Sequence, residues 1–314
     1  MIKLANSNRL HGLDHLRAIA ILLVMVFHFG KGVPSWLGPI QEIGWTGVDL
    51  FFVLSGYLIG FQLLKEYKDT HRISFKRFYL KRFFRIIPAY LAVLILYYSL
   101  PNLREGSGLP PLWRFLTFTQ NFGLDAQTQN SFSHAWSLCI EEQFYLILPI
   151  AIVGVFVSRT QKFTPYLIVA LVILGFILRY YNWNEYVQPF IESGNRRQMA
   201  LGFIEKVYYP SYNRMDGLLT GVAIAAISPN CVLYRFRSKF TFIIATLSYA
   251  IYLSHKQLYH LVKIAIERLG YESLEQSTFW ICILIAVFGG LILHLLIEKP
   301  FMKLRKKILF WGEG

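Results

Sequence analysis

The chain has 314 residues, of which 55% are hydrophobic and only 16% are charged. A soluble domain usually carries about a quarter charged residues and alternates apolar with polar positions. Here the apolar residues form long blocks, which excludes an ordinary soluble domain and indicates a membrane protein. The net charge of +14 does not indicate nucleic-acid binding, because the Lys and Arg residues lie between the apolar blocks, where membrane topology places them.

The three cysteines do not indicate a disulfide framework. Cys139, Cys231 and Cys282 lie far apart in the chain, and none of them belongs to a metal-ligand spacing. We therefore expect no metal cofactor.

Eight apolar blocks are candidates for transmembrane helices. Each approaches the roughly 20 residues that a helix needs to cross about 30 Å of hydrocarbon. In chain order the blocks run Leu13–Phe29, Thr46–Leu64, Ile86–Leu100, Leu138–Val157, Pro165–Tyr181, Tyr212–Ile227, Thr241–Leu261 and Thr278–Ile297. The sequence therefore predicts an all-α, polytopic membrane bundle of about eight transmembrane helices. We expect 1–314 to form one membrane domain without an appended soluble domain.

Lys and Arg residues in the loops predict the orientation of this bundle. With a cytoplasmic N-terminus, 20 of them fall on the inner side and 8 on the outer side. Cytoplasmic loops carry the excess of positive charge, so this orientation is favoured. An even number of spans then places both termini in the cytoplasm.

The first block contains the ionisable residues Asp14, Arg17 and His28, among others. Charged groups inside a bilayer are costly and usually indicate function or an internal ion pair. Arg17 and His28 are 11 residues apart. At about 100° per residue they share one helix face, about 16 Å apart along the axis. A structural alternative stays open, in which Asp14 pairs with Arg17 at the membrane interface and His28 reaches toward the headgroups.

The second block contains Asp49 and Ser55 among aromatic and glycine residues. An isolated carboxylate at the end of a span needs a partner, whatever its role. Glycines in a span are typical of close helix packing, and we interpret four of them in this way. These are Gly44, Gly47, Gly56 and Gly60.

A basic segment precedes the third block. Arg82 and Arg85 lie three residues apart, where a helix enters the membrane from the predicted cytoplasmic side. Forked guanidinium groups suit phosphate recognition. Positive residues at such a position also anchor helices with no further function, so both interpretations remain open.

Two adjacent acids in the fourth block are hard to explain by structure alone. Glu141 and Glu142 point about 100° apart on a helix, and each needs a cation or a proton inside a membrane. His134 precedes Glu141 by seven residues and shares its face if the helix extends that far. We therefore favour a functional role for this block.

Further polar residues occur in the last third of the chain. Arg214 and Asp216 open the sixth block, and the seventh places Ser248, Tyr252 and His255 on one helical face.

Glu298 ends the eighth block, where an ion pair between helices explains it as well as catalysis does. His260 and His294 show no spacing to a partner, and we interpret both as structural.

Seven segments resemble, in order, the motifs of the acyltransferase-3 family of membrane O-acyltransferases. They are LDHLRAIAILLVMVFH, GVDLFFVLSGYLIG, KRFFRIIPAY, HAWSLCIEEQFYLILP, RMDGLLTGVAIA, LSYAIYLSH and IEKPF. Members of this family modify lipopolysaccharide, peptidoglycan and other envelope glycans. They commonly have about ten spans, so the resemblance implies about eight to ten spans here.

The resemblance also implies roles for individual residues. His28 takes the place of the family's catalytic histidine, and Arg17 that of the family's arginine, which would steer the donor or fix charge near the site. Glu141 or Glu142 would orient His28 or bind the acceptor. Arg82 and Arg85 would hold the phosphates of an acyl-coenzyme A donor. The further candidates for orienting or substrate-binding roles are Asp14, Asp49, Ser55, His134, Trp136, Ser137, Arg214, Asp216, Tyr252, His255 and Glu298.

The implied function is transfer of an acyl group from cytoplasmic acyl-coenzyme A to a hydroxyl of a cell-envelope or exported polysaccharide or glycolipid. Acetyl is the default group and succinyl an alternative, and the implied location is a bacterial inner membrane. A transporter that exports an acylated or carboxylated molecule is the main alternative, although the sequence shows no internal repeat of the kind common in transporters. A non-catalytic scaffold for glycan assembly is the third.

Overall fold

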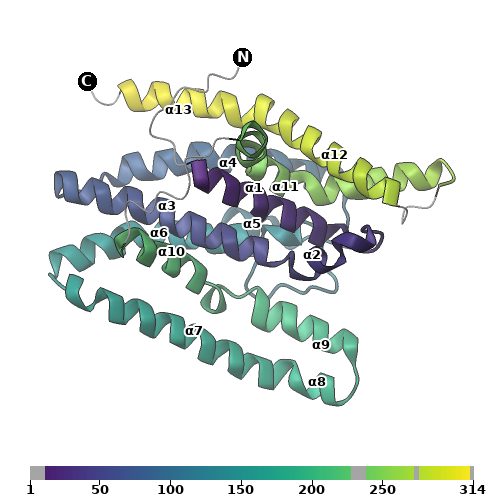
Figure 1. The fold of residues 1–314 in the computed structure, drawn as a ribbon, viewed down its shortest axis with the longest axis horizontal. Coiled ribbons are helices and arrows are strands. Elements are labelled where there is room, and N and C mark those ends of the chain that lie inside the picture. The colour runs from purple at the N-terminus through teal and green to yellow at the C-terminus, as the bar shows by residue number, and fades with distance from the viewer. Residues whose placement is uncertain (1–10, 228–237, 272–275, 312–314) are drawn as a thin grey trace.

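The regular secondary structure is helical. The computed structural model describes residues 11–227, 238–271 and 276–311, and no strand occurs within these ranges (Figure 1). The main helices are α1 (His11–Phe29), α3 (Thr46–Thr70), α4 (Phe75–Ser99), α6 (Trp136–Val157), α7 (Thr164–Tyr186), α10 (Asp216–Ile227), α11 (Lys239–Arg268) and α12 (Gln276–Leu293). The remaining helices are α2 (Gly38–Ile43), α5 (Leu112–Leu116), α8 (Gln188–Glu192), α9 (Arg196–Gly202) and α13 (Lys299–Trp311). The all-α prediction is confirmed, and Cys231 lies outside the described ranges.

Five helical stretches are long and apolar enough to cross a membrane. They are His11–Phe29, Thr46–Thr70, Ser133–Val157, Gln161–Glu192 and Gln276–Leu309. The other three predicted spans also fall on helices, but α4 and α11 are more polar and α10 has only 12 residues. The structure is therefore that of a multi-pass membrane protein, while the count of eight spans stays a prediction.

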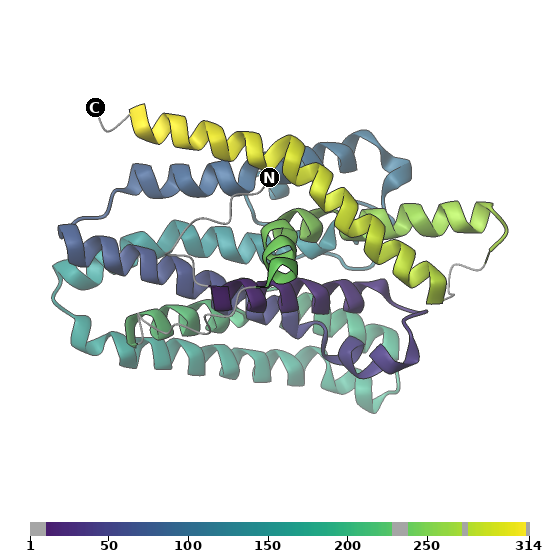
Figure 2. The ribbon, with the colours of Figure 1, turned by 45° about the horizontal axis from the view of Figure 1, so that its top comes forward.

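Helix α1 lies inside the bundle. It packs against α3 and α11, and α11 packs in turn against α12 (Figure 2). Close packing between α3 and α10 depends on glycine, because a Cβ atom on Gly56 would lie 2.0 Å from the Leu218 oxygen. On Gly47 it would lie 2.5 Å from the Ala20 oxygen of α1. The interpretation of the second block's glycines as packing residues is confirmed.

Helix α7 lies at the edge of the bundle (Figure 1). Only 6% of its most apolar stretch is buried inside the protein, against 50% of the corresponding stretch of α1. Large apolar side chains such as Tyr166 and Phe176 are exposed along it. A helix that is apolar all round and mostly exposed fits a lipid-facing position.

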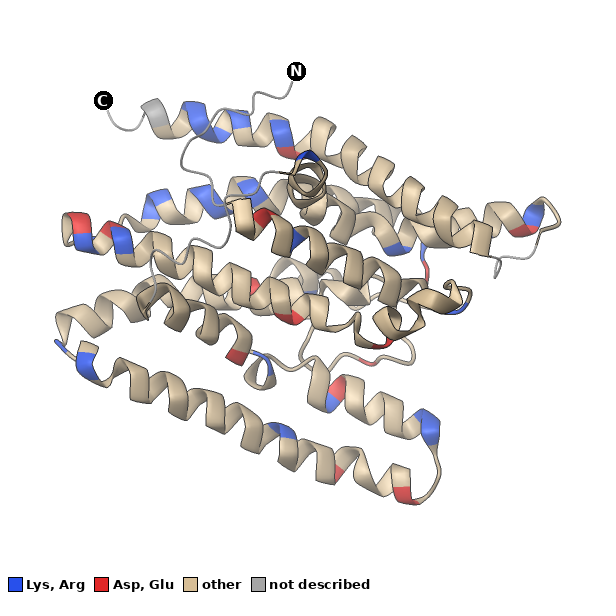
Figure 3. Cartoon of the chain, viewed as in Figure 1, with Lys and Arg blue, Asp and Glu red and all other residues tan. Residues whose placement is uncertain are grey.

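Basic residues gather at one end of the bundle (Figure 3). This end contains the last turns of α3, the first half of α4, and α13, which lies beside α4. Helix α4 begins here because the Ser74 hydroxyl accepts a hydrogen bond from the Arg77 amide at 3.4 Å, as an N-cap residue does. Arg305 of α13 donates to the carbonyl oxygen of Lys81 at 3.4 Å. This is the end predicted to face the cytoplasm, and we call it the basic end.

Candidate active site

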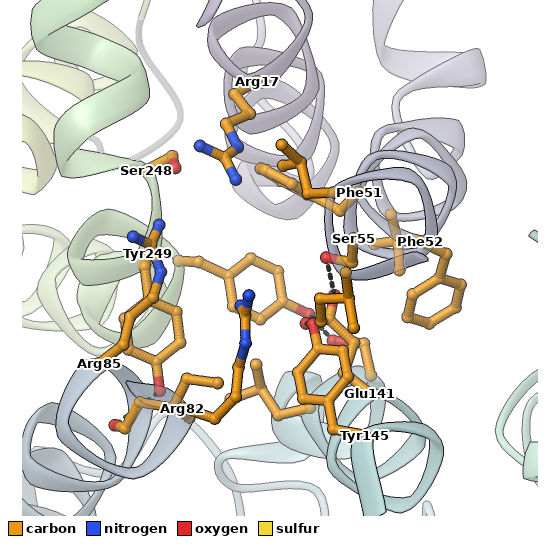
Figure 4. A pocket seen from close by; sticks show the side chains of 17 residues that line it. Arg17, Phe51, Phe52, Ser55, Arg82, Arg85, Glu141, Tyr145, Ser248 and Tyr249 are labelled. Carbon is orange, nitrogen blue, oxygen red and sulfur yellow. Dashed lines mark hydrogen bonds between the residues drawn. The ribbon is translucent and has the colours of Figure 1, made fainter. Parts of the chain in front are cut away.

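Five helices enclose a cavity toward the basic end, which we call the inner cavity (Figure 4). Its empty volume is about 770 Å³. Helices α1, α3, α4, α6 and α11 each contribute side chains to its wall. The sequence-predicted residues among them are Arg17, Ser55, Arg82, Arg85, Ser137, Glu141, Ser248 and Tyr252. Residues from five distant segments therefore meet around one space.

Three guanidinium groups border the inner cavity: those of Arg17, Arg82 and Arg85 (Figure 4). Among the described residues, no carboxylate forms an ion pair with any of them. Arg82 donates to the side-chain oxygen of Gln62 at 3.5 Å and lies 5.5 Å from the centre of the Tyr145 ring. Three cations that have no carboxylate at ion-pair distance in the described part of the chain make the cavity a fitting site for a phosphate-bearing anion.

The two adjacent acids occupy different environments. Glu141 borders the inner cavity, where its carboxylate accepts hydrogen bonds from the hydroxyls of Tyr145 at 2.6 Å and Ser55 at 3.2 Å. Glu142 points elsewhere, and its Oε1 is buried with no hydrogen-bond partner among the described residues. Neither acid bonds to His28, whose hydrogen-bonding partner is another histidine.

Three histidine rings form a cluster beyond the inner cavity. His28 Nδ1 lies 2.8 Å from His255 Nε2, and the two rings stack with centroids 5.0 Å apart. The ring of His134 lies 5.2 Å from that of His255, and its Nε2 lies 3.3 Å from the carbonyl oxygen of Leu253. His255 and His134 are buried, whereas His28 is partly exposed.

His28 borders a second space, which we call the outer cavity. Its empty volume is about 920 Å³, and its wall includes Lys256 and Glu105. The Lys256 ammonium lies 3.6 Å from the Glu105 carboxylate and donates to the Ser133 hydroxyl at 3.2 Å. Lys263 borders the same cavity and donates to the carbonyl oxygen of Phe29 at 2.9 Å. The outer cavity thus combines a histidine with several hydrogen-bonding groups.

Hydrogen bonds link the wall of the inner cavity to the histidine cluster. The Tyr252 hydroxyl donates to the carbonyl oxygen of His134 at 2.7 Å and lies 2.6 Å from the Ser137 hydroxyl. Tyr252 and Ser137 border the inner cavity, while His28 borders the outer one. The histidine cluster therefore lies between an arginine-lined cavity and a cavity on the opposite side.

Three predicted residues, Asp49, Arg214 and Asp216, form ion pairs away from both cavities. Arg214 pairs with Asp49, joining the start of α3 to the segment before α10. Arg179 of α7 pairs with Asp216 at 2.8 Å. The Arg214 guanidinium lies 5.8 Å from the centre of the Trp136 ring. These contacts tie helices together, and they match the structural interpretation of charges inside spans.

A third cavity of about 1160 Å³ lies beside the inner one and shares Arg17 and Arg85 with it. Asp14 and Glu298 also border this cavity. Glu298 accepts from the Nδ1 of His294 at 2.5 Å, within the π-helical stretch His294–Glu298. The interpretation of His294 as a residue without a partner was wrong, because the spacing of four residues to Glu298 indicates a contact on one helix face.

Sequence reasoning missed several residues of the site. Tyr145 follows Glu141 by four residues, a spacing that predicts their contact. Lys256 and Glu105 carry no such signal, because they lie on elements whose proximity only the fold creates. His260, interpreted as structural, borders the outer cavity.

The chain matches the family model described as "Acyltransferase domain" over residues 10–195. It is 34% identical over 236 residues to the peptidoglycan O-acetyltransferase OatA of Listeria monocytogenes, covering 69% of this chain and 34% of that protein. It is 30% identical over 255 residues to the O-acetyltransferase OatA of Staphylococcus aureus, covering 76% of this chain and 38% of that protein. The chain thus spans little more than a third of the length of these relatives, and no solved structure matches it.

Proposed function

The chain belongs to the acyltransferase-3 family, and we propose that it transfers an acyl group, by default acetyl, from acyl-coenzyme A to a glycan hydroxyl. The acceptor we propose is a cell-envelope or exported polysaccharide or glycolipid. One observation carries the proposal: His28 lies between an arginine-lined cavity and a separate outer cavity. Such an arrangement suits an enzyme whose donor and acceptor approach from opposite sides of a membrane.

The inner cavity is the proposed donor site. A coenzyme A thioester carries phosphates, and Arg17, Arg82 and Arg85 border the cavity with no carboxylate paired to them in the described part of the chain. The basic end of the bundle is proposed to face the cytoplasm, where acyl-coenzyme A is made. Both termini would then be cytoplasmic, and the membrane would be a bacterial inner membrane crossed by eight helices.

The outer cavity is the proposed acceptor site. The alcohol oxygen of the acceptor attacks the thioester carbonyl carbon, and the free imidazole nitrogen of His28 takes its proton. The carbon–sulfur bond then breaks, and the departing thiolate takes up a proton to give free coenzyme A. The products are an acyl ester and a thiol. The thioester would pass Tyr252 and Ser137 on its way to His28, because both border the inner cavity and their hydroxyls lie 2.6 Å apart.

The proposal is tested with purified protein in proteoliposomes. Acetyl-coenzyme A is supplied together with a chito-oligosaccharide probe, and free thiol and oligosaccharide mass are followed over time. Cell-envelope glycans with and without the gene are then compared by mass spectrometry. Thiol release that depends on a glycan and adds one acetyl group supports acyl transfer. Transport of the intact probe without thiol release, and unchanged envelope glycans, would reject acyl transfer in favour of a transporter.

A further inference from the structure

We propose that His255 is a positioning residue that holds His28 in the tautomer with hydrogen on Nδ1, so that Nε2 is the base. This inference rests on the proposed function, in which His28 takes the proton of the acceptor alcohol. It concerns a residue outside the stretch 10–195 that matches the family model.

The hydrogen-bonding network of His255 determines where its own hydrogen lies. Its Nδ1 is 2.9 Å from the carbonyl oxygen of Tyr252 and 3.1 Å from that of Ile251. A carbonyl oxygen accepts hydrogen bonds and cannot donate, so Nδ1 of His255 carries a hydrogen. A neutral imidazole holds one N–H, which leaves Nε2 of His255 as an acceptor.

The position of the hydrogen on His255 determines where the hydrogen of His28 lies. The Nδ1 of His28 lies 2.8 Å from the Nε2 of His255, and since that nitrogen is an acceptor, His28 must donate. Its Nε2 is left with a free lone pair. His255 is fully buried, whereas His28 is partly exposed at the outer cavity, so the free nitrogen belongs to the ring that substrate can reach.

The third histidine, His134, does not determine the tautomer of His28. The Nε2 of His134 bonds to the carbonyl oxygen of Leu253, and its Nδ1 is buried without a partner among the described residues. Its ring centroid lies 6.1 Å from that of His28. His134 therefore packs against the pair, and the tautomer of His28 depends on His255. A base held in its reactive tautomer by a buried partner is a general requirement of imidazole catalysis.

The decisive experiment measures the tautomer directly. Protein labelled with ¹⁵N-histidine is studied by NMR, and the His28 signals are identified by their loss in His28→Gln. Coupling to the ring protons distinguishes Nε2 from Nδ1, and the chemical shift shows which nitrogen carries hydrogen. We expect Nδ1–H and an unprotonated Nε2 in His28 of the unmodified protein. Hydrogen on Nε2 of His28, or on both nitrogens of His255, would overturn the proposal.

Variants of His255 test the consequence for the reaction. Gln places an oxygen near the position of the imidazole Nε2 and can still accept from His28. Asn is shorter by one methylene and cannot. We expect His255→Asn and His255→Leu to lower kcat by about 100-fold or more, as loss of a positioned base does. His255→Gln should stay within about tenfold of the unmodified protein, because the acceptor for the His28 hydrogen bond is kept and only the bond from Nδ1 to the carbonyl oxygens of the same helix is lost.

The KM values for acyl-coenzyme A and for the glycan should change little, because His255 borders neither cavity. Equal activity in the Gln and Asn variants would contradict the positioning role. The NMR result does not depend on activity. An active His28→Gln variant would reject His28 as the base, whereas a lack of glycan-dependent thiol release from the unmodified protein would reject the proposed function. The tautomer is measured independently of both, so the failures are distinguishable.

Discussion

Arg17 and His28 lie on the same helix but border different cavities. The guanidinium of Arg17 faces the inner cavity with two other arginines, and the imidazole of His28 faces the outer cavity. Helix α1 thus carries both an arginine of the proposed donor site and the proposed base. The two cavities, and the helix packing around them, can therefore be tested separately.

His28→Gln removes the proposed base while keeping a polar side chain of similar size. We expect acceptor-dependent thiol release to fall by about 10²–10⁴-fold, the usual contribution of a positioned general base. Protein yield and the thermal unfolding midpoint should stay close to those of the unmodified protein. His71→Asn is the matched control, because His71 is exposed at the end of α3 with a φ of 54° that Asn tolerates. Full activity of His28→Gln would remove His28 from the mechanism.

Arg82→Ala and Arg85→Ala each delete one cation of the inner cavity. A hydrogen bond to a charged group contributes about 1.5–3 kcal/mol, so KM for acetyl-coenzyme A should rise by about 10- to 100-fold. KM for S-acetylpantetheine, which lacks phosphates, should change far less. Arg72→Ala serves as control because Arg72 is exposed and borders none of the cavities described here. Equal effects on both thioesters would argue against phosphate binding at these arginines.

Gly56→Ala should loosen the contact between α3 and α10. The added Cβ would lie 2.0 Å from the backbone oxygen of Leu218, which cannot move without shifting a helix. We expect destabilisation of about 1–3 kcal/mol, as for other overpacked interiors, measured as a lower unfolding midpoint in detergent. Gly154→Ala is the control, since no atom lies within 4 Å of its added Cβ. Alanine there should be neutral or stabilising by up to about 1 kcal/mol.

Asp49→Asn tests whether the pair with Arg214 is structural. Arg214 is buried, and its Nε has no partner among the described residues, so removing the Asp49 charge leaves a cation poorly compensated. The Asp49 side chain is 38% exposed, which reduces the expected cost to about 1–2 kcal/mol of unfolding free energy. Both KM values should be unchanged, and the exposed Asp69→Asn should show no loss. A changed KM with unchanged stability would instead indicate that Asp49 contacts substrate.

Much of the helical framework was predictable because it depends on residues close together in the sequence. Apolar blocks define helices, and the spacing of three between Arg82 and Arg85 places both on one helix face, where the structure confirms that they border one cavity. The angle of about 100° between neighbouring residues likewise separates Glu141, which borders the inner cavity, from Glu142, which does not. The span count was less predictable, because polar helices such as α4 and α11 lie inside a bundle where hydropathy is a weak guide.

The amino-acid sequence was sufficient to predict the helical membrane character, the residues that need partners inside it, and the family to which they correspond. The identity of those partners depends on the tertiary structure. His28 meets His255 across 227 positions of the chain, and Glu141 is bonded by Tyr145 and Ser55 and not by the histidine it was expected to orient. The reason is physical: helical periodicity specifies which face a residue occupies, whereas the packing of whole helices determines which faces meet.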